Sequence, residues 1–596
     1  MKHAHAMPFG ATVRADGSGA DLHLWAPAAT EVALLLGPTA DALAPVPAAR
    51  AEGGWWHAAV DGAAAGARYQ WRIDGGQRVS DPAARENPDG PHAPSRLVDP
   101  AAFDWNDAGW TGRPWRETVL YELHVGTFTA EGTFDAAAQR LEELAALGIT
   151  AVELMPVADL PGRYNWGYDG VALFAPAHSY GPPESMKAFV ERARQLGLMV
   201  FLDVVYNHFG PDGNWLGLYA PQFFSATHAS PWGQAINFDG DGSATVREFF
   251  IHNALYWIEE FRIDGLRLDA VHAIVDDSRP DILEEISSRV RAAQPHRHVH
   301  LVLENDGNQS RRLARQPAAG RYDGQWNDDF HHAMHVALTG ETHRYYARYG
   351  NDPIALLGQV LVRGFAFPES ADDAPPPLPA TINYIGNHDQ VGNRARGERL
   401  AALAPPEAVS TALLLALLTP ATPMVFFGDE WGTRTPFLYF ADWQGELREA
   451  VRAGRKREFA HDDDGTLPDP CDIATFHRSH PDPAERDQSG AGARLAQVRQ
   501  ALALRRQWIA PRQERLADTD HEALRIGATG LHLRWHYRDG SRLLLDLNLG
   551  PDPVDASALA GRDPQAQLLL AHGDWPAAAP YWAPWSARWR LFEPSA

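Results

Sequence analysis

One pattern recurs from about residue 117 to residue 430: a helical stretch, a glycine that ends it, and then a short apolar strand. In the clearest instance, apolar residues recur at helical spacing from Phe134 until Gly148, and the strand sequence ITAVELM follows at 149–155. Helices and strands that alternate over roughly 300 residues predict parallel β/α units. Eight such strands in succession favour a closed (β/α)₈ barrel, or TIM barrel, over an open sheet. The expected strands cover residues 119–125, 149–155, 198–204, 264–269, 299–304, 323–327, 382–386 and 423–427.

The sequence on both sides of this pattern is typical of antiparallel β structure. Before the barrel, Val32, Leu34 and Leu36 alternate at the strand period of two, and short strands separated by Gly, Pro and Asp predict a small sandwich. After the barrel, alternating leucines on both sides of Asp539 and Gly540 predict a hairpin.

We therefore expect a multidomain chain. An N-terminal β-sandwich would cover residues 1–98, the barrel with irregular insertions 99–510, and a C-terminal antiparallel β domain 511–596. Segment 85–100 is rich in Pro and Asp, and we interpret it as a linker. Segment 440–490 has the same composition, so we expect irregular structure there.

Composition narrows the range of partners. The chain has 53 basic and 76 acidic residues, a net charge of −23, which argues against nucleic acid and anionic membranes because both require clustered Lys and Arg. The single cysteine, Cys471, excludes an intramolecular disulfide and a multi-cysteine zinc site. No apolar run is long enough to span a membrane, and the start MKHAHAMPFG lacks the apolar core of a secretory signal. We expect a cytoplasmic protein.

Polar residues follow four of the expected barrel strands at their carboxyl ends. The sequences are DVVYNH at 203–208, GLRLDAVH at 265–272, LEND at 303–306 and NHDQ at 387–390. In TIM barrels the reactive groups gather at this end of the strands, so each of the four brings a carboxylate to the same rim. A lone Asp after a strand is most often a helix cap, but independent caps would not all fall at these four ends.

Two of these carboxylates form a pair with different expected environments. Strand alternation turns Arg267 and Asp269 toward the barrel axis, and a neighbouring guanidinium lowers the pKa of a carboxyl group. Glu304 follows the apolar run HLVL with no basic residue adjacent in sequence, so we expect burial to raise its pKa. Glycoside hydrolysis uses one ionised and one protonated carboxyl group, which matches this expectation.

Two plainer interpretations of the same residues stay open at this point. His208 and His388 also fit core histidines with satisfied hydrogen bonds. The group Asp203, Asn207 and His208 also has metal-binding side chains, but its spacing matches no firm ligand motif.

The four strand ends resemble the four signature regions of the α-amylase superfamily of retaining glycoside hydrolases. The resemblance covers about residues 117–430, and the flanking β domains fit the plan of that superfamily, in which the N-terminal sandwich is immunoglobulin-like and similar to a carbohydrate-binding module. It implies that Asp269 is the nucleophile, Glu304 the general acid/base and Asp389 the stabiliser of the transition state.

The resemblance is closer to one family, the malto-oligosyltrehalose trehalohydrolases. It rests on QWNDDFHHAMH at 325–335, NHDQVGNRARGERL at 387–400, YELHVGTFT at 121–129 and WGYDGVALFAPAHSYG at 166–181. It implies hydrolysis of the α-1,4 bond between the trehalose end of maltooligosyltrehalose and the rest of the chain. The substrate-binding residues that it implies are Tyr168, His208, Arg267, His272, Asp329, His331, His332, His388, Gln390 and Asn393.

Among these, Tyr168 would stack under the sugar whose bond is cut, and His272 would face the leaving trehalose. A 1,4-α-glucan branching enzyme is the nearest alternative, but that family normally carries a glutamate where this chain has Gln390 and a different residue where it has His272. A non-catalytic α-glucan-binding protein is a second alternative, which the presence of all three acids with Arg267 opposes. No cofactor is expected, and the stretch 209–245 is too short for a large calcium-binding domain, so no structural metal is expected either.

Overall fold

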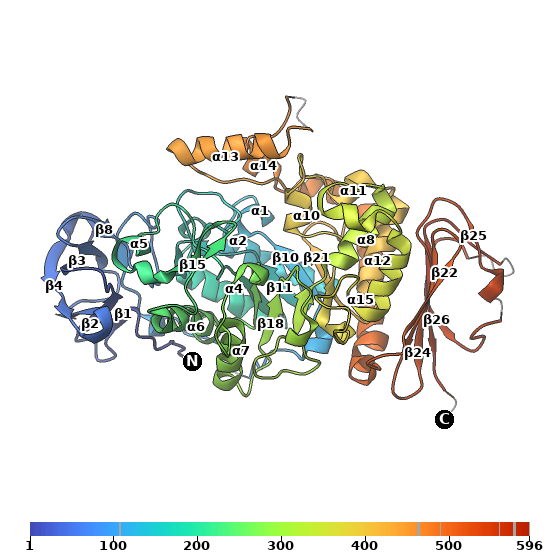
Figure 1. The fold of residues 1–596 in the computed structure, drawn as a ribbon, viewed down its shortest axis with the longest axis horizontal. Helices are drawn as coiled ribbons and strands as arrows, with labels where there is room; N and C mark the ends of the chain where they lie inside the picture. The colour runs from blue at the N-terminus through green and yellow to red at the C-terminus, as the bar shows by residue number, and fades with distance from the viewer. Residues whose placement is uncertain (107–108, 462–464, 489, 560, 576–579, 595–596) are drawn as a thin grey trace.

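Three groups of elements follow one another along the molecule (Figure 1). The computed structural model describes residues 1–596 except 107–108, 462–464, 489, 560, 576–579 and 595–596. The N-terminal sheets lie at one end, the parallel barrel with its helices lies in the middle, and the C-terminal sheets lie at the other end. Among the described residues, no helix combines the length and apolarity needed to cross a membrane.

Eight parallel strands close the central barrel, since β21 pairs with β10, and each overlaps one of the predicted ranges. The strands are β10 Leu120–Leu123, β11 Ala151–Leu154, β14 Met199–Val204, β17 Gly265–Leu268, β18 His300–Leu303, β19 Gly324–Trp326, β20 Thr381–Asn383 and β21 Thr422–Phe426. Apolar side chains such as Met199, Phe201 and Met424 fill part of the interior. The predicted (β/α)₈ fold is confirmed.

Helices surround this barrel as the alternating pattern predicts. They are α3 Leu141–Leu147, α4 Pro183–Gln195, α6 Ser243–Glu259, α7 Ile282–Ala293, α8 Asp328–Thr339, α9 Pro353–Arg363, α12 Pro406–Leu417 and α15 Ala491–Leu504. Gly148 ends α3 in the left-handed conformation with φ 112°, which a residue with a Cβ rarely adopts. After β14 the chain forms an antiparallel pair, β15 Phe224–Ser230 and β16 Gly233–Ile236, above the carboxyl ends of the strands.

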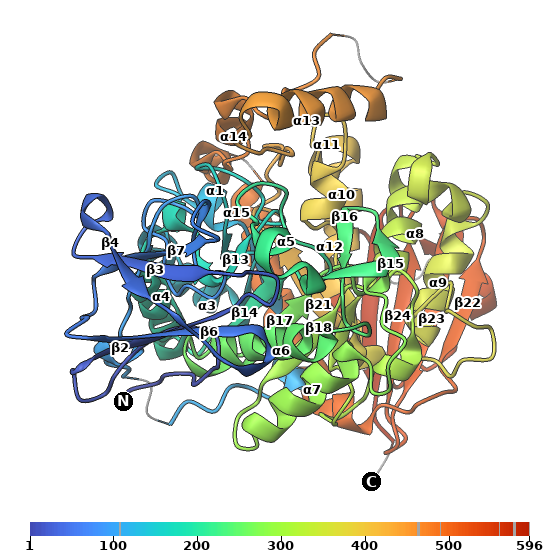
Figure 2. The ribbon, with the colours of Figure 1, turned by 60° about the vertical axis from the view of Figure 1, so that its left-hand side comes forward.

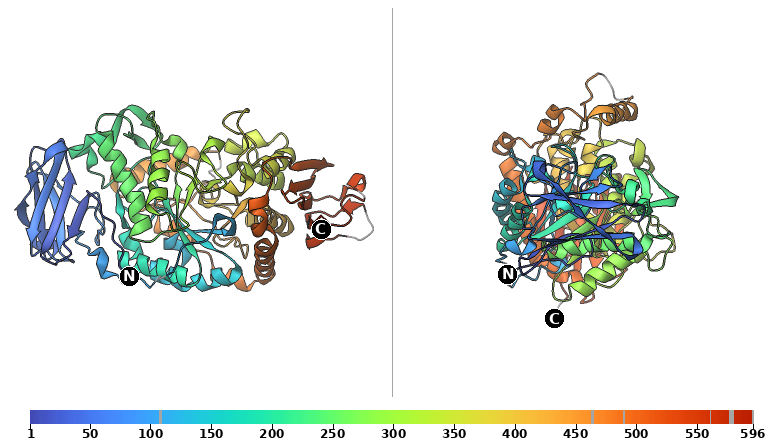
Figure 3. Two further views of the ribbon diagram at one scale, coloured as in Figure 1. Left: turned by 90° about the horizontal axis from the view of Figure 1, so that it is seen from below. Right: turned by 90° about the vertical axis from the view of Figure 1, so that its left-hand side faces the viewer.

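The N-terminal residues form two antiparallel sheets, which Figure 3 shows as separate layers. One sheet has the order β1-β2-β6-β5 and the other β4-β3-β7-β8, with β9 also paired to β7. Leu22, Leu34 and Trp71 from the two sheets are almost fully buried in a shared core, so the predicted sandwich is confirmed. The strands are β1 Gly10–Val13, β2 Gly19–Trp25, β3 Val32–Gly37, β4 Ala44–Pro47, β5 Ala49–Arg50, β6 Trp55–Asp61, β7 Arg68–Ile73, β8 Arg78–Val79 and β9 Ser95–Arg96.

The interpretation of residues 85–100 as a linker is wrong. Ser95 and Arg96 form β9, and Arg85 is buried, with its Nε 3.2 Å from the carboxylate of Glu260 after α6. The same guanidinium donates to the carbonyls of Ala11 in β1 and His5. Because three groups from the N-terminal segment and from the end of α6 meet at the buried charge of Arg85, this segment joins the sandwich to the barrel instead of separating them.

The C-terminal residues form one five-stranded antiparallel sheet of order β22-β23-β24-β28-β26, as predicted. Its strands are β22 Glu522–Ile526, β23 Gly530–His536, β24 Arg542–Asn548, β26 Gln567–His572 and β28 Ser586–Phe592. The predicted hairpin at Asp539 and Gly540 joins β23 to β24. The Trp535 indole donates to the carbonyl of Leu361 in α9 at 2.8 Å, which fixes the sheet against the barrel helices. The domain limits at 98/99 and 510/511 stay predictions.

The segment 440–490 contains helices that its Pro- and Asp-rich composition did not predict. Figure 2 shows α13 Gly445–Glu458 and α14 Ile473–Arg478 above the barrel. Leu447 and Val451, four residues apart on α13, pack against a small buried cluster that includes Trp443 and Cys471. The expectation of irregular structure was wrong there because this short apolar stripe lies among many charged residues, and the Pro and Asp residues flank it.

We predict that Arg85→Ala lowers the free energy of unfolding by about 3–5 kcal/mol, because removal of one partner leaves the Glu260 carboxylate buried without its main counter-charge. Urea denaturation followed by far-UV circular dichroism measures the change. Arg78→Ala, at an exposed position of the same sandwich, serves as the control and should change the free energy by less than about 0.5 kcal/mol. Equal effects of the two substitutions would contradict the assigned role of Arg85.

Candidate active site

The predicted polar residues meet at the carboxyl ends of the barrel strands. Asp203 in β14 lies directly beside Arg267 in β17, since the two residues are register partners on paired strands. Asp269 and Glu304 follow β17 and β18, which also pair. Asp389 follows β20 on the other side of β19. Five residues that are up to 186 positions apart are therefore carried on strand ends of one rim.

Arg267 is the centre of the site. Its side chain is fully buried, and its guanidinium carbon lies 4.0 Å from the ring centre of Trp326. Nη1 donates to Asp203 at 2.6 Å and to Asp269 at 2.8 Å, and Nη2 forms an ion pair with Glu304 at 2.8 Å. Burial opposes the positive charge, but the surrounding carboxylates outweigh it and raise the pKa of Arg267 well above its usual value. One guanidinium therefore holds three carboxyl groups together.

Asp269 is held from both sides. Its Oδ1 accepts from Arg267, and its Oδ2 accepts from the Asn207 amide at 2.8 Å. Burial raises the pKa of Asp269 above its usual value, Arg267 acts in the opposite direction, and the nearby Asp203 carboxylate raises it further. The expectation that Arg267 leaves Asp269 with a lowered pKa is wrong, because desolvation and a second carboxylate outweigh the guanidinium.

Glu304 has a more polar environment than its sequence neighbours indicate. Besides the ion pair with Arg267, its Oε2 accepts from the backbone amide of Ala270 at 2.7 Å. Ala270 adopts a left-handed conformation with φ 41°, a conformation that a residue with a Cβ adopts only at a cost. The strained turn after β17 thus points an amide at Glu304. The expectation of an apolar setting is wrong, because Arg267, which is distant in sequence, contacts Glu304 in the fold.

A short helix presents the residues that follow β20. Asn387 caps α10, His388–Gly392, because its side-chain oxygen accepts from the amides of Asp389 and Gln390. The cap fixes the direction in which the first turn leaves the barrel. Asp389 therefore stands at the rim in a position set by the NHDQ sequence itself.

His388 lies between two carboxylates. Its Nδ1 forms an ion pair with Glu122 of β10, and its Nε2 lies 3.5 Å from Asp389. Burial disfavours the charged ring, but Asp389 and Glu122 outweigh it and raise the pKa of His388 to about 9. The ring is therefore an imidazolium at neutral pH, which gives Asp389 a positive neighbour. Asn393 donates to Asp389 at 3.1 Å.

Tyr168 and His208, which were predicted to bind substrate, each form a ring contact. The Tyr168 hydroxyl donates to Asp203 at 2.6 Å, and its ring stacks on His388 at 5.0 Å. His208 stacks at 5.7 Å on Trp232, which lies in the turn between β15 and β16 and is half exposed. Trp232 did not enter the sequence interpretation, because nothing in its local sequence connects it with the rim.

The three predicted acids are accessible from outside. The side chains of Asp269, Glu304 and Asp389 keep 12%, 16% and 34% of their surface exposed. His272 is exposed at the rim, and its Nδ1 accepts from the amide of Asp306 at 3.5 Å. A sugar that contacts the acids from the open side would therefore also meet this imidazole.

Three other predicted residues are buried in the wall of the site. Asp329 accepts from the amides of Ala366 and Phe367, and it is 1% exposed. His331 and His332, in α8, are also buried, and both contact tyrosine hydroxyls. In this structure the three support the wall and do not present a side chain to the open rim, because protein groups occupy their polar atoms or surround them.

Two acids that the sequence interpretation missed do belong to the site. Asp328, the first polar side chain of α8 after β19, accepts from Gln390 at 2.9 Å. Glu153 in β11 lies inside the barrel beside Glu122, and both of its carboxyl oxygens are buried without a hydrogen-bond partner. The position of Asp328 directly after a strand was a usable signal, but Glu153 looks like any residue of a buried strand.

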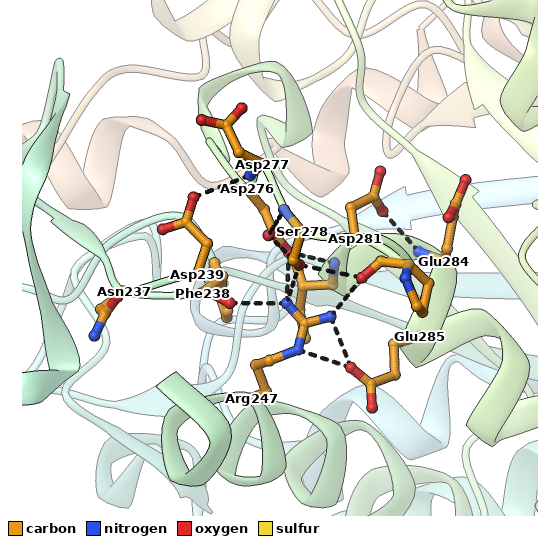
Figure 4. Close-up of polar contacts among 12 residues, drawn as sticks. Asn237, Phe238, Asp239, Arg247, Asp276, Asp277, Ser278, Asp281, Glu284 and Glu285 are labelled. Atoms are coloured by element: carbon orange, nitrogen blue, oxygen red, sulfur yellow. Dashed lines mark hydrogen bonds and ion pairs between the residues drawn. The ribbon is translucent and has the colours of Figure 1, made fainter. Parts of the chain in front are cut away.

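The loop after β17 is anchored by Arg247 of α6 (Figure 4). Its guanidinium donates to Asp276, to Ser278, to the carbonyl of Pro280 and to Glu285 of α7. The loop that starts at Asp269 and Ala270 is thereby fixed at its far end as well.

Near this loop, His228, Asp239 and Asp277 place ligand-type atoms within 4.8 Å of one another. Asp239 Oδ2 already accepts from the His228 ring and from the Asp277 amide, both at 3.0 Å, and Asp277 is exposed. These internal bonds account for the grouping. The expectation of a chain without a structural metal stays a prediction.

Known proteins are similar to this chain both in single domains and over most of its length. Residues 97–220 match the alpha amylase catalytic domain, and residues 8–94 match carbohydrate-binding module 48, the isoamylase N-terminal domain. The malto-oligosyltrehalose trehalohydrolase of Arthrobacter ramosus is 40% identical over 571 residues, covering 92% of this chain and 95% of the relative. The chain belongs to the malto-oligosyltrehalose trehalohydrolase family. It is thus a glycoside hydrolase of the alpha amylase type, as predicted.

A second trehalohydrolase and a solved structure also match most of the chain. The malto-oligosyltrehalose trehalohydrolase of Saccharolobus solfataricus is 40% identical over 485 residues, covering 79% of this chain and 83% of the relative. A crystal structure described as an alpha amylase from Salmonella typhimurium superposes with a TM-score of 0.91 at 37% identity, covering 99% of this chain and all of that one. The trehalohydrolase chain therefore shares its three-part fold with a protein of known structure.

We predict that Glu153→Gln stabilises the protein at pH 8 by about 1–3 kcal/mol, because the neutral amide needs no proton on folding and a shift of one pKa unit corresponds to about 1.4 kcal/mol. Burial raises the pKa of Glu153 well above its usual value, and the charges of Glu122 and Asp203 raise it further. The folded state therefore binds this proton more tightly than the unfolded state. Its stability falls as the pH rises above the ordinary pKa of a glutamate, and this slope is absent in the variant.

Urea denaturation at pH 5 and pH 8 measures the two free energies of unfolding. The gain from Glu153→Gln should be larger at pH 8 than at pH 5. Glu131→Gln, at an exposed position, is the matched control and should show no such difference. An equal effect of Glu153→Gln at both pH values would refute the protonation argument.

Proposed function

We propose that this enzyme hydrolyses the α-1,4 bond next to the trehalose end of maltooligosyltrehalose, with retention of the anomeric configuration. The single observation that supports the mechanism most is the pairing of Asp269 and Glu304 on one buried guanidinium, Arg267. Two carboxyl groups that flank one bond are the machinery of a glycosidase, and retention is the outcome that the resemblance to the α-amylase superfamily implies. The substrate follows from the family to which the chain belongs.

In the first step Asp269 attacks the anomeric carbon of the maltooligosyl unit, while Glu304 gives its proton to the glycosidic oxygen. The bond to trehalose breaks, trehalose leaves, and a covalent glycosyl ester forms on Asp269. Asn207 and Arg267 hold the two oxygens of Asp269, so the carboxylate needs no reorientation before it attacks.

In the second step Glu304, now ionised, takes a proton from water, and this water attacks the same anomeric carbon. The ester bond to Asp269 breaks, and the maltooligosaccharide leaves with the α configuration. Arg267 contacts Glu304 and Asp269 in both steps, so the negative charge moves between two carboxyl groups that share one counter-ion.

Asp389 and His388 act on the sugar ring in both steps. Asp389 would accept hydrogen bonds from sugar hydroxyls, which strengthen as positive charge develops at the anomeric carbon. The His388 imidazolium, 3.5 Å from Asp389, keeps that acid close to a positive charge. Tyr168, stacked on His388, would offer its ring to the sugar whose bond is cut, and His208 would contact the same sugar.

Transfer of the glycosyl unit to another glucan, as in a branching enzyme, is opposed by Gln390. Its amide donates to Asp328, so a glutamate at this position would place a carboxylate against a carboxylate. Absence of new α-1,6 linkages in the product, read by NMR, tests this alternative.

We also propose that the protein acts in the cytoplasm.

We predict that Asp269→Asn and Glu304→Gln each lower kcat on maltooligosyltrehalose by about 10³-fold or more, because each removes a group that forms or breaks a bond. Released trehalose, measured by chromatography, gives the rate, and NMR of the fresh product gives the anomer.

Asp372→Asn, in the exposed loop between α9 and β20, is the matched control and should keep the wild-type rate. Near-native activity of either variant would refute the role assigned to that acid. A β-configured product would refute the double displacement.

A further inference from the structure

Asp328 occupies a position that the mechanism above does not use. It follows β19, which lies between β18 and β20 in the barrel, so it stands between the strand ends that carry Glu304 and Asp389. Asp269 lies on the other side of Glu304, after β17. A sugar that leaves from the Glu304 side of the cut bond would therefore meet Asp328.

The contacts of Asp328 leave one oxygen for a ligand. Tyr384 donates its hydroxyl to Oδ1 at 2.5 Å, and Gln390 donates its amide to the same atom at 2.9 Å. Within the described part of the chain, Oδ2 accepts no hydrogen bond from protein, and the residue is partly exposed. Two donors thus fix the carboxyl group while its second oxygen stays available.

The side-chain amide of Gln390, which binds Asp328, has one atom without a hydrogen-bond partner. The Gln390 Oε1 atom is buried and has no hydrogen-bond partner, although its Nε2 binds Asp328. Burial of such an acceptor costs free energy unless a ligand donates to it. Asp328 and Gln390 together therefore form a bonded pair with one accessible and one unsatisfied oxygen, a combination suited to polyhydroxyl ligands.

The charged groups that act on Asp328 are other acids. Burial raises its pKa to about 7, and Glu304, Asp389 and Asp306 add to the effect. A carboxyl group in this field gains from sugar hydroxyls, which donate to it without bringing another negative charge.

We propose that Asp328, held by Gln390 and Tyr384, is a specificity-determining residue that binds a hydroxyl of the leaving trehalose through Oδ2. This proposal rests on the proposed function, since it assumes a sugar leaving group. On this proposal, Asp328, between β18 and β20, determines which leaving group the enzyme accepts, whereas Asp269 and Glu304 break the bond.

The test compares two substrates that differ only in the leaving group: maltotetraosyltrehalose and 4-nitrophenyl α-maltotetraoside. Asp328→Asn should lower kcat/KM for release of trehalose by about 10- to 100-fold, the contribution of one hydrogen bond to a charged group. For release of nitrophenol the loss should stay below about 3-fold. Tyr384→Phe should shift the ratio of the two kcat/KM values in the same direction but less, because Gln390 still holds Asp328.

Thermal denaturation confirms that both variants fold, and Asp372→Asn serves again as the exposed control. Equal losses on the two substrates would overturn the proposal, since Asp328 would then act on the reacting acids and not on the leaving sugar. No loss on either substrate would overturn it as well. A wild-type enzyme that cleaves the aryl maltoside but not maltotetraosyltrehalose would refute the proposed function itself, and this proposal with it.

Discussion

The site depends on one buried positive charge. Arg267 lies inside the barrel with no exposed surface, and carboxylates from three strand ends contact its two terminal nitrogens. Without the guanidinium, three acids in a low-dielectric interior would repel one another. The charge balance also explains why the barrel tolerates so many carboxyl groups at one rim: Arg267 and the imidazolium of His388 are placed among them.

The buried carboxyl groups of this site are costly in free energy because they lose their contacts with water. Asp203, Asp269 and Asp389 all have raised pKa values, and burial is the largest cause for each. The attacking acid therefore relies on its direct contacts with Asn207 and Arg267 to be ionised, and substrate hydroxyls that replace water extend the same compensation. In such a site, positioning and charge stabilisation come from the same hydrogen bonds.

The sequence was sufficient for elements with a strong period and for residues directly after strands. Alternating helices and strands predicted every barrel strand, and the four strand-end sequences predicted residues that the structure brings to one rim. Sequence could not show that Arg267 reaches Glu304 as well as Asp269, since that contact depends on the closure of the barrel. Nor could it separate Asp328, which faces the rim, from Asp329, which is buried behind it, because the two are adjacent and chemically identical.

The contact between Arg85 and Glu260 bears on how such a chain is assembled from modules. The two matched family models meet between residues 94 and 97, as if the chain could be divided there. Yet Arg85 lies on one side of that border and the carboxylate that neutralises it lies on the other, where Lys187 is a second cation at 3.5 Å from it. A barrel without the sandwich would keep the Glu260 carboxylate but would lose Arg85, its principal counter-ion. Exchange of this N-terminal module between enzymes thus requires a matched change in the barrel.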